Sequence, residues 1–389
     1  MGRSPGPRGV SHRLRRPPGG TPVRQLGPFD ADGTSLTHSP YARGKKSVEL
    51  DITSPDGAEA LRGLAASADV LLESAPPGEL TSLGLGPDVL AEINPALVIA
   101  SISPFGQTGP KADWAATDLT VWASGGPMHL CGDEDRAPLG VGVPQAFRHA
   151  AAHAASLVTL ALVERNQSGE GQHIDVSAQA VAMNSTMSSV LCSLIGAPLT
   201  LRGGGAVRSG DLRLRFMYPA SDGHVSVTHV FGAAIGPATA RLMNLVHEAG
   251  FCDSETASKD WIGYGMALSD GSETIEDFER TKECVAAFTA SRTKQELFAL
   301  ANEHRLLLAP VATTADVAAS EQLATRSYWD VVDGKRYPGH WMKPEPTDGS
   351  ADRVPAVGEH TAAVLASQRT PAVFSPRRRR PDVSARSKA

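Results

Sequence analysis

The sequence predicts an α/β fold built on a parallel sheet. Short apolar runs alternate with amphipathic segments between Arg43 and Val176, and strands that alternate with helices at this spacing form right-handed βαβ units. Residues 97–101 are uncharged and partly β-branched, which is typical of a strand buried on both faces. The glycine-containing loop 105–110 follows directly, and open α/β sheets place ligands at such strand ends.

The individual elements follow from local patterns. Apolar residues recur at helical spacing in residues 58–67, after the turn signature Ser-Pro-Asp-Gly at 54–57, so a helix is expected there. Local patterns also give the remaining elements in chain order: strands at 43–51 and 68–73, short helices at 80–85 and 88–93, a long helix at 146–164, a strand at 173–176, a helix at 183–195, a turn and strand at 221–227, and a helix at 289–302.

Composition excludes several classes of protein. A net charge of −5 over 389 residues argues against a nucleic-acid partner. The cysteines, Cys131, Cys192, Cys252 and Cys284, have neither metal-ligand nor redox spacing, so we expect no metal and reduced thiols in a cytoplasmic protein. The most apolar run, residues 150–163, is too short to span a bilayer, and no secretory signal is present. We therefore expect no membrane association.

Eight sequence motifs occur in a fixed order along the chain. They are RPPGGTPVR, RGKKSVELD, ADVLLESAPPGELTSLGLG, NPALVIASISPFGQTGP, DLTVWASGG, RNQSGEGQHIDVSAQ, FTASRTKQELFALANEHRLLLAPV and VGEHTAAVL. Together the chain resembles the family III CoA-transferases, which include formyl-CoA transferase, carnitine CoA-transferase and 2-methylacyl-CoA racemase. The resemblance runs from about residue 16 to about residue 365. It implies a Rossmann-like large domain built from both chain ends, a smaller inserted α+β domain, and an interlocked dimer.

The resemblance also implies domain boundaries. The large α/β domain is expected to comprise residues 29–200 and 311–368, with the small domain at 201–310. Residues 1–28 are expected to form a disordered or degenerate arm, and residues 369–389 a basic disordered tail. Relatives begin with a strand and helix that residues 1–15 are too short and too polar to supply, which indicates a truncated copy or a misassigned start.

The family's catalytic aspartate is missing. Family III enzymes form an aspartyl-CoA thioester, which is covalent catalysis, and counting back from the Gly-x-Gly-Gln signature at 169–172 places Phe147 at that position. No acid occurs between Arg136 and Leu162. Asp118 matches an aspartate of the racemases, but Thr117 replaces the histidine that precedes it there. The catalytic residues are therefore unassigned, with Asp118 and His149 as weak candidates.

His149 lies two residues beyond the expected nucleophile and four before His153. Near a helix start, His149 is a candidate general base. A pair of histidines at this spacing can also bind metal, but no acid accompanies them on that face. The simpler interpretation is that both are packed or half-exposed helix residues.

The resemblance assigns contacts with coenzyme A to six residues: Arg16, Leu50, Thr53, Ser74, Ala75 and Pro76. Arg16 would meet the CoA phosphates, and the backbone at 74–76 would cradle adenine. Thr53 replaces a lysine, and Ser82 replaces an arginine of the family pattern. Each lost guanidinium removes a charge-assisted bond worth about 1.5–3 kcal/mol, so we expect weaker CoA affinity than in a standard member.

The resemblance implies transfer of CoA between an acyl-CoA and a carboxylic acid. Because Phe147 carries no nucleophile, two alternatives stay open. One is an acyl-CoA isomerase or lyase without a covalent aspartyl intermediate, and the other is a non-catalytic subunit of a hetero-oligomeric CoA-transferase. The expected partners are the acyl-CoA and carboxylic acid substrates and either a second copy or a paralogue in a dimer.

Overall fold

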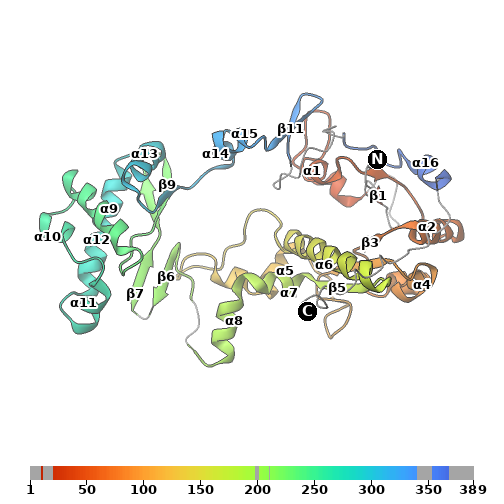
Figure 1. The fold of residues 1–389 in the computed structure, drawn as a ribbon, viewed down its shortest axis with the longest axis horizontal. Coiled ribbons are helices and arrows are strands. Elements are labelled where there is room, and N and C mark those ends of the chain that lie inside the picture. The colour runs from red at the N-terminus through yellow and green to blue at the C-terminus, as the bar shows by residue number, and fades with distance from the viewer. Residues whose placement is uncertain (1–9, 12–20, 198–200, 210, 340–352, 368–389) are drawn as a thin grey trace, which may run out of the picture. The chain divides into compact units, whose positions relative to one another are not determined.

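The computed structural model describes residues 10–11, 21–197, 201–209, 211–339 and 353–367. The chain divides into two compact units. Unit 1 draws on the described parts of Met1–Gly125, Val143–Ser185 and Glu321–Ala389, and unit 2 on those of Gly126–Gly142 and Thr186–Ser320. Figure 1 gives the element labels.

Unit 1 contains the elements of both chain ends. Its strands are β1 (Val10–Ser11), β2 (Lys46–Ser47), β3 (Val70–Glu73), β4 (Val98–Ser103), β5 (His173–Ser177), β11 (Trp329–Val332) and β12 (Lys335–Pro338). Its helices are η1 (Pro22–Gln25), α1 (Ser39–Ala42), α2 (Pro55–Ser67), α3 (Glu79–Ser82), α4 (Pro87–Ile93), α5 (Asp118–Ser124), α6 (Ala146–Ser168), α7 (Ala178–Met183), α15 (Glu321–Thr325) and α16 (Thr361–Ala366).

A parallel sheet in the order β3-β4-β5 forms the centre of unit 1. Alternate residues of a strand face opposite sides of a sheet, and the apolar clusters follow this rule. Leu97 and Ile99 pack with residues of α2 and α4, whereas Val98 and Ala100 pack with residues of α6. Residues 97–101 are all buried, as the sequence predicts. Helices cover both faces of the sheet, which makes unit 1 a mixed α/β fold.

The two ends of the chain meet within unit 1. The backbone N–H of His360 donates to the Ser47 carbonyl at 2.9 Å, and the Glu49 N–H donates to the Thr361 hydroxyl at 3.0 Å. In the β11–β12 hairpin, Lys335 forms ion pairs of 2.8 and 2.6 Å with Asp30 and Asp32. These contacts join segments about three hundred residues apart.

Unit 2 contains a small antiparallel sheet in the order β10-β9-β8 and a separate hairpin, β6–β7. Its strands are β6 (Ala206–Ser209), β7 (Leu212–Arg215), β8 (Met217–Ala220), β9 (Gly223–Val227) and β10 (Leu308–Pro310). Its helices are η2 (Pro127–Leu130), α8 (Met187–Leu194), α9 (Gly236–Glu248), α10 (Ser254–Ala257), α11 (Tyr264–Asp270), α12 (Ile275–Ala290), α13 (Lys294–His304) and α14 (Thr314–Ala318), and the turn η3 (Asn184–Thr186) lies at its edge. Aromatic side chains including Tyr218, Trp261, Tyr264, Phe278 and Phe288 fill its core.

The unit boundaries differ from the expected domain limits. Unit 2 begins at residue 186 rather than 201 and ends at 320 rather than 310. It also takes residues 126–142, because the Arg202 guanidinium donates to the carbonyls of His129, Asp133 and Arg136 at 3.1–3.3 Å. Long-range bonds of this kind leave no local sequence pattern.

Three expected segments also differ. The helix expected at 289–302 is divided into α12 and α13, because Thr293 and Glu296 form a capping box that starts a new helix. The helix expected at 183–195 is divided by η3 into α7 and α8. Residues 22–25 of the expected disordered arm form η1, and the Arg24 side chain donates to the Pro355 carbonyl at 3.0 Å. The basic tail 369–389 lies outside the described residues.

Candidate active site

The first turn of α6 is held by an acid from another helix. Gln145, the N-cap residue, makes no side-chain cap of its own. Instead, the Asp118 carboxylate accepts from the Gln145 N–H at 2.7 Å through Oδ1 and from the Phe147 N–H at 3.0 Å through Oδ2. Both N–H groups belong to the unsatisfied donors of a helix start. Both oxygens of Asp118 are therefore engaged in fixing α6.

Phe147 is half-buried as the second residue of α6, and its backbone is bound by Asp118. His149 is exposed, and its ring lies 5.4 Å from the ring of Trp122 on α5. His153, one turn further along, is also exposed. Among the described residues no group of three or more histidine, cysteine, aspartate or glutamate side chains could hold a metal ion. Asp118, Phe147 and His149 thus lie together at one helix end without a free carboxylate among them.

The Gly-x-Gly-Gln signature has a structural role. Gly169 ends α6 with a φ of +85°, a conformation that favours glycine. A Cβ on Gly171 would lie 2.0 Å from the Leu97 carbonyl oxygen, so a side chain there would displace the entry to β4. Asp175 on β5 accepts from the Gln107 N–H at 2.9 Å and holds the loop that follows β4.

The segments expected to bind CoA are brought together in part. Leu50 and Ala75 contact one apolar cluster, which also contains Ile52, Ala58 and Leu80. Ser74 and Pro76 beside Ala75 are exposed, as is Thr53. The Thr53 hydroxyl donates to Asp51 at 2.6 Å, and Arg16 lies outside the described residues.

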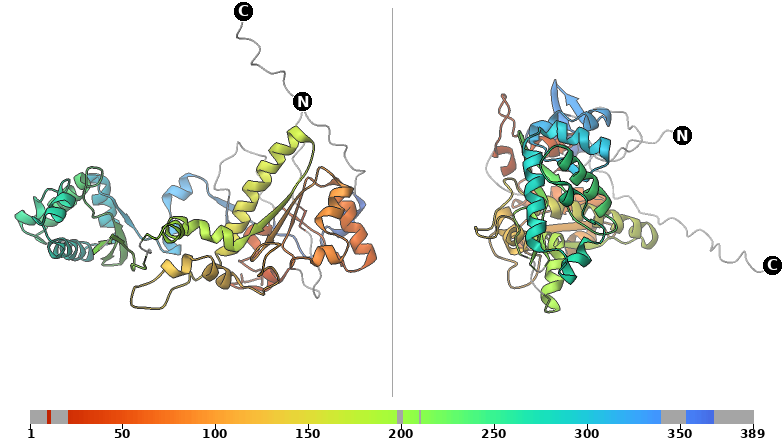
Figure 2. Two further views of the ribbon diagram at one scale, coloured as in Figure 1. Left: turned by 90° about the horizontal axis from the view of Figure 1, so that it is seen from below. Right: turned by 90° about the vertical axis from the view of Figure 1, so that its left-hand side faces the viewer.

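Helix α6 exposes more apolar surface than a helix that is fully packed in a protein core. Its buried residues, Ala146, Ala150, Ala154, Val158, Ala161 and Arg165, form one stripe, while Leu157, Leu160 and Val163 are 41–64% exposed. By length and composition α6 is the one helix among the described residues that could cross a membrane, a test that core helices of soluble proteins also pass. Its buried stripe packs against β4 and β5, and Figure 2 shows the long helix running beside the sheet.

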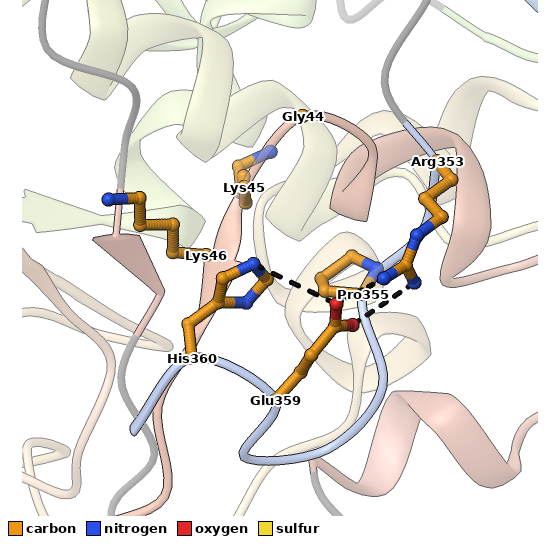
Figure 3. Close-up of a pocket in the computed structure, with 7 residues that line it drawn as sticks. All are labelled: Gly44, Lys45, Lys46, Arg353, Pro355, Glu359 and His360. Atoms are coloured by element: carbon orange, nitrogen blue, oxygen red, sulfur yellow. Dashed lines mark hydrogen bonds and ion pairs between the residues drawn. The ribbon is translucent and has the colours of Figure 1, made fainter. Parts of the chain in front are cut away.

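Sequence reasoning missed a basic cavity elsewhere in unit 1. Figure 3 shows the seven residues that line it: Gly44, Lys45, Lys46, Arg353, Pro355, Glu359 and His360. Gly44, Lys45 and Lys46 belong to the RGKKS motif, and Glu359 and His360 belong to the VGEHT motif, whereas Arg353 and Pro355 precede it. Both motifs carry the family resemblance but were given no role. The sequence signal that could have indicated this cavity consists of the two lysines in RGKKS and the histidine in VGEHT.

Comparison with known proteins identifies the family. The model of CoA-transferase family III matches residues 14–361. The chain belongs to this family. It is 31% identical to succinyl-CoA:(R)-benzylsuccinate CoA-transferase subunit BbsE of Thauera aromatica, over 90% of this chain and 85% of that protein. It is 29% identical to the succinyl-CoA–L-malate CoA-transferase beta subunit of Chloroflexus aurantiacus, over 91% and 85%.

A solved structure shares the fold of this family III chain. The crystal structure of a CAIB/BAIF family protein from Brucella suis superposes with a TM-score of 0.76 at 25% identity, covering 92% of this chain and 91% of that one. The family predicted from the ordered motifs is therefore confirmed, as is a mixed α/β fold with a parallel sheet.

Proposed function

We propose that this chain is the subunit of a hetero-oligomeric family III CoA-transferase that does not supply the nucleophile. In this assembly a paralogous subunit carries the catalytic aspartate, and the complex moves CoA between an acyl-CoA and a carboxylic acid. The present chain contributes the fold, the partner interface and a CoA-binding surface around residues 50–53 and 74–76.

The observation that carries the proposal is the occupation of the α6 N-terminus. Phe147 has no atom that can attack a thioester, and covalent CoA transfer needs such a group. Asp118 is the acid bound there, yet both of its oxygens accept backbone N–H groups of α6. An attack by Asp118 on a thioester would leave those donors without an acceptor, which opposes its use as the nucleophile.

The apolar surfaces support a partner chain. Leu157, Leu160 and Val163 on α6 are exposed in unit 1. In unit 2, helix α8 has no buried residue, and Leu194 and Ile195 at its end are 75% and 78% exposed. Exposed apolar side chains gathered on helices are typical of protein interfaces. Two relatives carry the word subunit in their names.

The same considerations extend to the expected CoA site and location. Leu50 and Ala75 share an apolar cluster, which supports a common binding surface for the two loops and adenine contacts through the backbone at 74–76. Thr53 and Ser82 in place of basic residues support weak CoA binding by the isolated chain. The cysteines in the described residues are free thiols, which fits the cytoplasmic location that we propose.

The test compares the chain alone with its assembly. The purified chain is incubated with succinyl-CoA and a panel of dicarboxylates. Borohydride then reduces any protein-bound CoA thioester to an alcohol with release of CoA, and mass spectrometry locates the reduced carboxylate. We expect no transfer and no modified carboxylate from the chain alone, and transfer after a co-purifying family member with an aspartate at the aligned position is added. Rapid transfer by the chain alone, with a thioester on one of its own residues, would refute the proposal.

A further inference from the structure

The loop that follows β4 exposes a large aromatic side chain. This loop, residues 104–117, leaves the carboxyl end of β4, which is the middle strand of the sheet β3-β4-β5. Open α/β sheets bind ligands beyond the carboxyl ends of their strands. Trp114 in the loop is 58% exposed, whereas tryptophan is highly buried on average in folded proteins. Its ring is therefore available to a ligand at this end of the sheet.

Two other side chains of the loop lie against Trp114. The ring of Phe105 meets the Trp114 ring edge to face, with the ring centroids 6.4 Å apart. The Lys111 ammonium lies 5.2 Å from the centroid of Trp114 and 6.0 Å from that of Phe105. The loop thus presents two aromatic rings and one cation together, and Phe105, Lys111 and Trp114 are called the aromatic–lysine cluster below.

Lys111 has no anionic partner in the part of the chain that the structure describes. Its side chain contacts the two rings there. Asp113, the nearest acid in the sequence, is exposed, and the described residues show no ion pair between it and Lys111. A cation–π contact near the surface is weaker than a charge-assisted hydrogen bond. The ammonium group would therefore favour a carboxylate over the two rings.

A second donor of the same loop lacks an acceptor. The Nε2 atom of Gln107 is buried, and no atom of the described residues accepts a hydrogen bond from it. The backbone around it is fixed, because the Gln107 N–H donates to Asp175 Oδ2 at 2.9 Å and the Gly106 N–H donates to the Ser103 hydroxyl at 3.0 Å. A buried donor without an acceptor is costly, so a ligand that supplies acceptor oxygens would suit this loop.

The aromatic–lysine cluster lies close to the start of α6. Trp114 precedes Asp118 by four positions, so the Cα atoms of these two residues are at most about 14 Å apart. Asp118 accepts from the N–H of Phe147 at 3.0 Å, and Phe147 is the residue at the expected position of the nucleophile. A small molecule bound to the cluster would therefore lie near the place where the family carries out acyl transfer.

We propose that the loop after β4 binds a carboxylic acid that carries an aromatic ring, with the carboxylate at Lys111 and the ring against Trp114. A carboxylate accepts a charge-assisted hydrogen bond from an ammonium group, and aromatic rings pack against one another offset or edge to face. A single cation without an anionic partner matches a single carboxylate. The inference rests on the proposed function and deepens it: the acid substrate of the exchange is an aryl carboxylate held by this chain.

Calorimetry on the full chain with three probes separates the contribution of the ring from that of the charge. 3-Phenylpropanoate carries a ring and a carboxylate, 3-phenylpropanamide keeps the ring without the charge, and hexanoate keeps the charge without the ring. We expect 3-phenylpropanoate to bind at least about tenfold more tightly than either of the other two. A smaller preference over either probe, or no binding of 3-phenylpropanoate, overturns the proposal.

Two variants assign the contacts to residues. Lys111→Met removes the charge and keeps the stem, so the affinity for 3-phenylpropanoate should fall about tenfold while that for 3-phenylpropanamide stays the same. Trp114→Ala should weaken both aromatic probes and leave hexanoate unchanged. Misfolding would weaken all three probes, which distinguishes it from these selective losses. The control Arg326→Met removes an exposed cation of unit 1 outside the loop and should change nothing. Unchanged binding of 3-phenylpropanoate in either cluster variant overturns the proposal.

Competition tests whether a nucleotide is the better ligand, because a nucleotide also combines a ring with negative charge. Adenosine 3′,5′-bisphosphate should displace 3-phenylpropanoate weakly or not at all, and displacement with higher affinity than that of 3-phenylpropanoate itself overturns the proposal. These binding measurements require no transfer activity. Lack of 3-phenylpropanoate binding by a chain whose assembly transfers CoA would refute this inference alone, whereas rapid transfer by the isolated chain would refute the proposed function.

Discussion

The clearest prediction concerns Asp118, whose two oxygens hold the N-terminus of α6. In Asp118→Ala the N–H groups of Gln145 and Phe147 lose acceptors at 2.7 and 3.0 Å. Replacing a capping side chain by alanine costs about 0.5–2 kcal/mol, and this carboxylate also interacts with the positive end of a 23-residue helix. Asp118 is half-buried, so water can accept hydrogen bonds from the freed N–H groups and offset part of the lost stability. We expect the free energy of unfolding to fall by about 2 kcal/mol.

Asp118→Asn should cost about half as much, because the amide keeps one acceptor oxygen for one of the two N–H groups. Urea unfolding followed by circular dichroism measures the stability of both variants. Hydrogen exchange measures the local effect, which we expect at the amides of Gln145 and Phe147. Asp113→Ala is the matched control, since Asp113 is an exposed acid of the segment that precedes α5.

One result would refute the reasoning about Asp118. If Asp118→Asn left unfolding and amide exchange unchanged but abolished CoA transfer by the isolated chain, Asp118 would be a reacting group rather than a helix cap. The inference that no catalytic carboxylate lies at this end of α6 would then be wrong, and the chain would be a catalytic subunit.

Three further predictions follow from other positions. Phe147→Asp should gain a hydroxylamine-sensitive, protein-bound CoA after incubation with acyl-CoA, whereas Phe147→Asn should not; labelling of neither would show that Phe147 is not at the nucleophile's position. Gly171→Ala should lower the free energy of unfolding in urea by about 3 kcal/mol, since the alanine Cβ would lie 2.0 Å from the Leu97 carbonyl oxygen. The control Gly142→Ala, which has open space around the Cβ, should unfold at the same urea concentration as the parent. Burial, and then the Lys282 charge, lower the pKa of His229 to about 3, so the unfolded chain takes up a proton on this histidine at a higher pH than the folded chain does. The free energy of unfolding should therefore fall as the pH is lowered from 6.5 to 3, by up to about 1.4 kcal/mol per pH unit. An unchanged pH dependence of stability in His229→Phe would contradict this.

Local sequence patterns were sufficient to predict the central strand of unit 1. The uncharged run at 97–101 predicts a buried strand, and β4 is buried on both faces. The break between α12 and α13 was readable as well, because Thr293 and Glu296 have the spacing of a capping box. A continuous apolar pattern across 289–302 obscured it.

Long-range contacts account for what the sequence did not predict. Asp118 caps a helix that begins 28 residues later, and no local motif pairs an acid with a distant helix start. Arg202 draws residues 126–142 into unit 2 through backbone carbonyls, which every residue type carries. The basic cavity requires Lys45 and His360 to meet, and neither segment alone indicates a concave site.

The joining of Ser47 to His360 has a consequence for synthesis of the protein. The bond between them spans 313 positions, so β2 emerges from the ribosome long before the residues that complete its surroundings. The strands β3, β4 and β5 can pair once residue 177 has been made, because their pairing involves only earlier residues. The basic cavity must wait for residues 353–360.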